Sequence, residues 1–155
     1  MGKISKDKRL FELQRLLAEL QQQYKLSRED VLKAAERSVL IPVSLFSSGL
    51  SSLEIIVKYL LENQKLSISE VSRLVLRPRQ AVYQAYKSSK LKSPSRFKPR
   101  PSKFDFPVFV IANSRYSVLE SIVRFLKIHH NLSFAAIAAL LCRDQRTIWT
   151  VHNRL

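Results

Sequence analysis

Two stretches of the chain decide the fold: IPVSLFSSGLSSLEIIVKYLLENQKLSISEVSRLVLRPRQAVYQAY (residues 41–86) and FPVFVIANSRYSVLESIVRFLKIHHNLSFAAIAALLCRDQRTIWTVH (residues 106–152). A shift of 66 residues aligns Leu53 with Leu119, and it keeps the neighbouring glutamates and most apolar positions in register. So many matches in one register indicate an internal duplication, and each copy is a unit of one architecture.

Each copy predicts the same elements in the same order. An apolar lead-in that contains proline comes first, followed by an S-x-x-E capping box, a helix with apolar residues at helical spacing, a further N-cap serine and two short helices. The lead-ins are residues 41–46 and 106–111, the capping boxes begin at Ser51 and Ser117, and the second N-caps are Ser67 and Ser133. Each repeat is therefore expected to be a three-helix module.

The segment before the repeats predicts a pair of amphipathic helices, the first with leucines at helical spacing and the second capped by Ser27. Such a pair needs an apolar partner, and two partners stay open: the first repeat, or another copy of the chain in a homodimer. The predicted fold is thus all-α. Its domains are an N-terminal helical pair (1–40), a first helix-turn-helix repeat (41–87), a basic linker (88–105) and a second repeat (106–155).

The connection between the repeats is rich in Lys, Arg, Ser and Pro, and residues 87–103 contain no acid. Two interpretations stay open. The segment is either a solvated tether or a strand that lies along a phosphate backbone or in a minor groove. In the second case its phosphate-contacting residues are Lys92, Arg96, Lys98 and Arg100.

The composition favours a polyanionic partner. The formal net charge is +15, and self-repulsion of this size is a cost unless a polyanion offsets it. Nucleic acid is the favoured partner over an anionic membrane or an acidic protein. The single cysteine, the lack of a signal-peptide pattern and the lack of an apolar run of about 20 residues predict a soluble, cytoplasmic, nucleoid-associated protein without a membrane partner.

The last two predicted helices of each repeat follow the helix-turn-helix pattern of apolar and small residues. In the second copy the pattern comprises Ile137, Ala138, Leu141, Thr147, Ile148 and Val151, and in the first copy Val71, Ser72, Val75, Ala81, Val82 and Ala85. Two residues depart from it in each copy: Leu76 and Cys142 replace the turn glycine, and Arg77 and Arg143 replace an apolar turn residue.

This segment resembles the helix-turn-helix of sigma-factor fourth regions and of LuxR-type regulators, in which E-I-A-x-x-L, a turn and x-T-[IV] lead into the helix that reads DNA. The matching residues are Glu70-Val71-Ser72, Ile137-Ala138 and Arg146-Thr147-Ile148. The resemblance implies that the last helix of each copy lies in a major groove.

By analogy of position, the outward residues of the two last helices contact bases. They are Arg79, Gln80, Tyr83, Gln84 and Lys87 in the first copy, and Gln145, Arg146, Thr150 and Asn153 in the second. Arg grips guanine, and Gln and Asn grip adenine, in that groove. Arg77 and Arg143 are assigned to phosphates. Tyr83 and Trp149 occupy equivalent positions, and partial packing against the preceding helix is favoured for both.

Metal and catalytic sites are not expected. The spacing of His129, His130, Cys142 and His152 matches no zinc pattern, and the acids form no cluster. The chain is therefore interpreted as a non-enzymatic protein without cofactor that binds duplex DNA, as a transcriptional regulator or a mobile-element-associated factor. An RNA-binding accessory protein and an adaptor that docks on an acidic protein stay open as alternatives.

Overall fold

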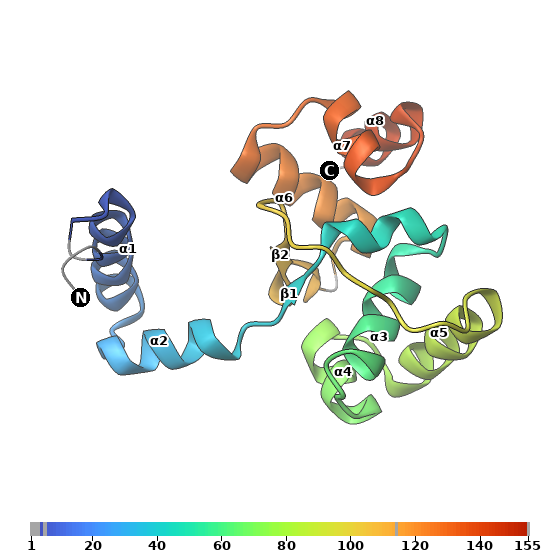
Figure 1. Ribbon diagram of the computed structural model, residues 1–155, viewed down its shortest axis with the longest axis horizontal. Helices are drawn as coiled ribbons and strands as arrows, with labels where there is room; N and C mark the ends of the chain where they lie inside the picture. Colours follow the sequence, from blue (N-terminus) through green and yellow to red (C-terminus); the bar gives the residue numbers. More distant parts are fainter. Residues whose placement is uncertain (1–3, 5, 114, 155) are drawn as a thin grey trace. The chain divides into compact units, whose positions relative to one another are not determined.

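The computed structural model describes residue 4, residues 6–113 and residues 115–154, so residues 1–3, 5, 114 and 155 of the predicted domains lie outside the described part. The fold is all-α with one small two-stranded sheet (Figure 1). The chain divides into two compact units, residues 1–39 and residues 40–155. Both repeats and their connection therefore belong to one unit.

The first unit is a helical hairpin of α1 (Lys8–Tyr24) and α2 (Arg28–Arg37). Asp7 and Ser27 cap the two helices, and Leu17 and Val31 are buried between them. Large apolar side chains stay exposed on both helices, among them Phe11 at 73%. The homodimer through this hairpin stays a prediction.

The second unit contains the two repeats in the same element order. The first comprises β1 (Leu40–Ile41), the 3-10 helix η1 (Val43–Ser48), α3 (Ser52–Glu62), α4 (Ile68–Val75) and α5 (Arg79–Lys92). The second comprises β2 (Phe106–Pro107), η2 (Val108–Ile111), α6 (Val118–His130), α7 (Phe134–Leu141) and α8 (Gln145–Asn153). Every helix from α3 to α5 begins 66 residues before its counterpart.

The helix starts follow from the serines that the sequence places there. Ser51 and Ser117 accept a hydrogen bond from the backbone N–H three residues on, and Glu54 and Glu120 return the bond to the serine N–H. Both capping boxes are thus complete, and each satisfies two of the N–H groups that a helix start leaves without partners.

The two lead-ins meet at the centre of the unit. Strands β1 and β2 pair antiparallel, with Ile41 opposite Phe106, and the rings of Phe46 and Phe106 lie 6.3 Å apart. η1 packs on α7 of the other repeat, and η2 packs on α4. Each fully buried Phe or Ile here contributes about 1.5–3 kcal/mol, so the core stabilises both repeats together.

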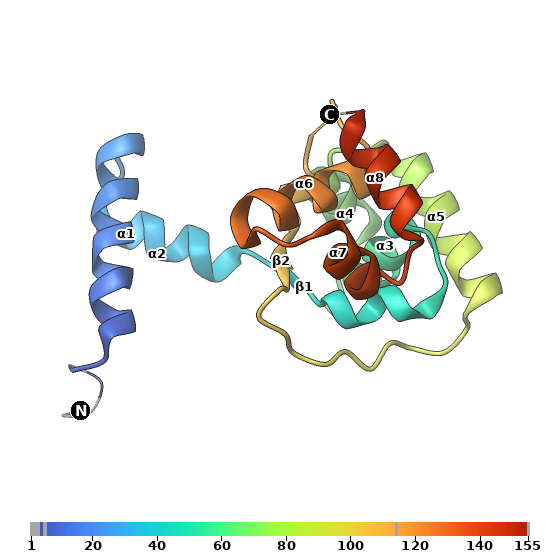
Figure 2. The same ribbon diagram turned by 90° about the horizontal axis from the view of Figure 1, so that it is seen from above.

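The basic connection lies along the first repeat and is not a free tether (Figure 2). Asn63 donates to the carbonyl of Phe97 at 3.1 Å, and the backbone N–H of Arg100 donates to Ser44 at 2.9 Å. α5 also continues to Lys92, past the predicted repeat boundary at residue 87, because its last turns bury Ser89 and bind α3. The solvated-tether interpretation of this segment is therefore wrong.

Candidate nucleic-acid interface

The turns between α4 and α5 and between α7 and α8 have the same geometry. Leu76 (φ 50°) and Cys142 (φ 49°) adopt the left-handed conformation that ends each preceding helix. Glycine is the usual residue there because it lacks the Cβ that makes this conformation costly. In the first repeat the Ser72 hydroxyl also donates to the Arg77 carbonyl at 2.6 Å, which closes the turn. The turn thus forms without its glycine.

The inner faces of α5 and α8 hold both helices in place. Val82 and Ala85 of α5 are buried against α3 and α4, and Ile148 and Val151 of α8 are buried against α6 and α7. The side opposite these residues faces solvent in both helices.

All nine residues assigned to base contact are exposed on that outer side. They are Arg79, Gln80, Tyr83, Gln84, Lys87, Gln145, Arg146, Thr150 and Asn153. Tyr83 and Trp149 are 52% and 54% exposed, so about half of each ring stays on the outer face. The sequence assignment therefore places an amide-rich, basic surface on each helix, and its contact with bases stays a prediction.

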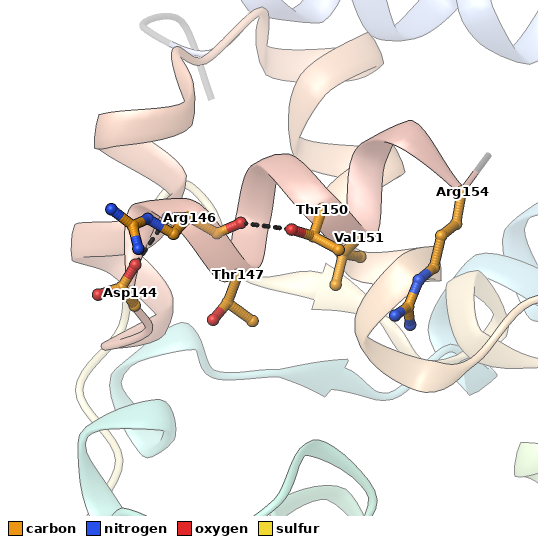
Figure 3. A pocket seen from close by; sticks show the side chains of 6 residues that line it. All are labelled: Asp144, Arg146, Thr147, Thr150, Val151 and Arg154. Carbon is orange, nitrogen blue, oxygen red and sulfur yellow. Dashed lines mark hydrogen bonds between the residues drawn. The ribbon is translucent and has the colours of Figure 1, made fainter.

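Two further residues of α8 and its C-cap belong to this surface. Arg146, Thr147, Thr150 and Arg154 line an open hollow along the helix, with the two arginines at its ends (Figure 3). The Thr150 hydroxyl donates to the Arg146 carbonyl at 2.9 Å. The sequence assignment omitted Thr147 and Arg154, although Arg154 follows Thr150 at the i, i+4 spacing that keeps residues on one helix face.

Arg77 and Arg143, assigned to phosphates, bind backbone carbonyls of the other repeat. Arg77 donates to the Asn113 carbonyl at 2.8 Å and to the Tyr116 carbonyl at 3.4 Å. Arg143 donates to the Leu50 carbonyl at 2.7 Å. Both side chains are partly buried, so the structure gives them a role in joining the repeats, and phosphate contact stays a prediction.

The basic residues of the connection also have partners in the first repeat. Lys92 forms an ion pair with Glu54 at 2.9 Å, and Arg96 donates to the Glu62 carbonyl at 2.7 Å. Lys98 and Arg100 are exposed, and only the backbone of Arg100 is tied down by the hydrogen bond to Ser44. Contact of these residues with phosphates stays a prediction.

The acidic residues of this unit have structural roles, which leaves the outer faces of α5 and α8 basic. Residues 40–155 hold 18 of the 27 basic and six of the 12 acidic residues, a net charge of +12. Glu54, Glu70, Glu120 and Asp144 cap helices, Asp105 accepts from the backbone N–H of Val43, and Glu62 pairs with Lys58 and Lys90.

Two of these carboxyls are held in the charged form. Burial favours the neutral form of Glu54, but hydrogen bonds from Ser88, Lys92 and the Ser51 backbone outweigh it and lower its pKa. Burial opposes the charge of Glu62 in the same way, and bonds from Lys58 and Lys90 lower its pKa.

The described residues include no cluster of three His, Cys, Asp or Glu side chains that could hold a metal ion. The histidines lie beside aromatic rings instead: His129 against Phe125 at 4.7 Å, and His152 against Phe134 at 5.1 Å between ring centroids. Among the described helices, none is long and apolar enough to cross a membrane. Comparison of the chain with models of protein families, with curated proteins and with solved structures gives no match.

Proposed function

We propose that this protein binds duplex DNA with sequence preference, through the outer faces of α5 and α8. One observation carries the proposal: each helix buries one side in the unit and exposes a basic, amide-bearing side, on a unit of net charge +12. A helix of this kind fits the major groove, where Arg, Gln and Asn side chains discriminate base edges. The finer role is that of a transcriptional regulator or a mobile-element-associated factor.

The way the unit uses its acids supports a polyanionic ligand. Helix caps and ion pairs occupy the carboxylates, so the field outside α5 and α8 is dominated by Lys and Arg. Such a field attracts phosphates and accelerates encounter with nucleic acid.

Titration of a labelled duplex at several salt concentrations tests the proposal. If about eight phosphates are neutralised, log affinity against log salt falls with a slope near −7. A slope near −1, or displacement by structured RNA at lower concentration than by unlabelled duplex, contradicts the proposal and favours the RNA-binding alternative.

A matched pair of charge removals locates the binding surface. Arg146→Gln removes one positive charge from the outer face of α8, and Lys33→Gln removes one from the exposed surface of α2. We expect the first variant to weaken duplex binding and to reduce the salt slope by about 1, while the second changes neither. Equal effects of the two variants contradict the placement of the surface.

A further inference from the structure

The two repeats contact each other through equivalent parts of their sequences. Leu40 pairs with Pro107, and Ile41 pairs with Phe106. The 66-residue shift carries residue 40 to residue 106 and residue 41 to residue 107, so it converts each pair into the other. A contact that maps onto itself in this way is characteristic of two copies related by a two-fold rotation.

The arginine contacts obey the same relation. Arg77 donates to the carbonyl of Tyr116, and Arg143 donates to the carbonyl of Leu50. The same shift carries Arg77 to Arg143 and Leu50 to Tyr116. The packing of η1 on α7 and of η2 on α4 is reciprocal in the same sense.

A hollow of about 460 Å³ between the repeats completes the pattern. Each repeat lines it with the start of its first helix and with its turn arginine. The residues are Ser51, Ser52, Leu53 and Arg77, with their equivalents Ser117, Val118, Leu119 and Arg143. Strand pairing, arginine contacts and hollow thus share one approximate two-fold axis, which relates α5 to α8.

We infer that the DNA target consists of two half-sites in inverted orientation at one fixed spacing, an inference that rests on the proposed function. The backbone of duplex DNA has two-fold symmetry, so a two-fold pair of reading helices meets its half-sites in opposite directions. Half-sites in the same direction require modules related by translation, which the antiparallel pairing of β1 with β2 does not provide. The compact packing of the repeats fixes the spacing, because no free tether lies between them.

The two half-sites have different sequences, because the outer faces of α5 and α8 differ. Arg79, Gln80, Tyr83, Gln84 and Lys87 stand where the second repeat has Gln145, Arg146, Trp149, Thr150 and Asn153. These side chains have different base preferences. The target is therefore an imperfect palindrome, with the orientation of the protein set by which half-site is which.

Binding to a set of synthetic duplexes tests the inference with the full chain. The half-sites obtained by selection from random duplex are rebuilt as an inverted pair, as a direct pair, as a single half-site, and as an inverted pair with about five extra base pairs, half a helical turn, between the halves. We expect the native inverted pair to bind about 100-fold tighter than the other three, because only there do both modules bind at once. Equal affinity for the direct pair or the single half-site overturns the inference and leaves the proposed function standing. Absence of binding to every duplex, at low salt too, overturns both.

A helix-face exchange gives a second, independent test. The variant Gln145→Arg/Arg146→Gln/Trp149→Tyr/Thr150→Gln/Asn153→Lys gives α8 the outer residues of α5 and leaves the buried Ile148 and Val151 in place. We expect selection with this variant to return a perfect palindrome of the α5 half-site. Its melting temperature serves as the folding control, and a selected direct repeat overturns the inference.

Discussion

The two repeats differ most on the outer side of their first helices, α3 and α6. Lys58 of α3 has no exposed side-chain area, whereas Arg124, at the equivalent position of α6, is exposed. In the first repeat, Glu62 binds the Lys58 ammonium at 2.6 Å, and the ring of Phe97 lies 5.1 Å from it. In the second repeat, Ile128 replaces the glutamate and is 63% exposed.

This difference teaches that one helical pattern supports a closed and an open groove, depending on what covers it. In the first repeat, the last turns of α5 and the segment that carries Phe97 cover α3. In the second repeat, α8 ends at Asn153, and the equivalent face of α6 borders a hollow of about 460 Å³. The connecting segment is therefore part of the first repeat's structure.

The largest expected effect comes from breaking the buried ion pair of the closed groove. Glu62→Ala leaves the Lys58 ammonium buried without its carboxylate, and we expect a loss of about 3–5 kcal/mol in the free energy of unfolding. Ile128→Ala at the equivalent exposed position should cost less than about 1 kcal/mol. Urea denaturation measures both.

The double variant Lys58→Met/Glu62→Ala is the control. It removes the charge together with its partner and should recover most of the loss. Equal losses for Glu62→Ala and Ile128→Ala would show that the closed groove does not bury the pair.

The arginines that join the repeats come next in size. Arg77 donates to four carbonyls and Arg143 to two. Since a hydrogen bond from a charged group contributes about 1.5–3 kcal/mol, Arg77→Ala should destabilise by about that amount and Arg143→Ala by less. Arg79→Ala, on the exposed face, should stay within about 0.5 kcal/mol. If phosphate contact were the sole role of Arg77, its loss would leave the unfolding curve unchanged.

The lowered pKa values of Glu54 and Glu62 predict a pH dependence that belongs to the closed groove. Because folding lowers both pKa values, the two groups stabilise the fold fully above their ordinary pKa of 4.5, and this contribution is lost as the pH falls through the folded values. Glu54→Gln should therefore show a smaller loss of stability between neutral and acidic pH than the wild type, measured by thermal melts across that range. An unchanged pH profile contradicts the account of Glu54.

The smallest expected effect concerns the turns, in which the repeats are alike. The left-handed conformation of Cys142 costs about 1–2 kcal/mol for a residue with a Cβ, and glycine gives back about 0.5–1 kcal/mol through the unfolded chain. Cys142→Gly should therefore gain about 0.5–1 kcal/mol. Leu76→Gly should gain less, because it also loses the buried part of a side chain that is 56% exposed.

Ala139→Gly, at an exposed position inside α7, is the matched control for the turn substitution. It should lose about 1 kcal/mol, since glycine is unfavourable within a helix. A loss for Cys142→Gly as large as that for Ala139→Gly would contradict the left-handed turn.

Local signals made the helices predictable. The serine caps fix where α3 and α6 begin, and the apolar spacing around Ile148 fixes which side of α8 is buried. These signals act within a few residues of each other, so one sequence contains them in full. The all-α class and the exposed side of both last helices follow from such signals alone.

Contacts between distant segments were not predictable in the same way. An arginine in a turn binds a phosphate or a carbonyl equally well, and only the position of Tyr116 decides the partner of Arg77. The basic composition around Phe97 likewise indicates an extended segment, but its docking depends on Asn63, 34 residues away in sequence. The reciprocity of these contacts is visible only once the two repeats are placed together.

Selection from random duplex DNA, carried out in parallel with the wild type and with Arg146→Ala, tests the central claim most directly. The account predicts that the variant keeps the base preference of the half-site bound by α5 and loses the preference at one or two positions of the other half-site, at a cost of about 1–3 kcal/mol. Identical motifs for the two proteins, or no enriched motif for the wild type, would contradict it.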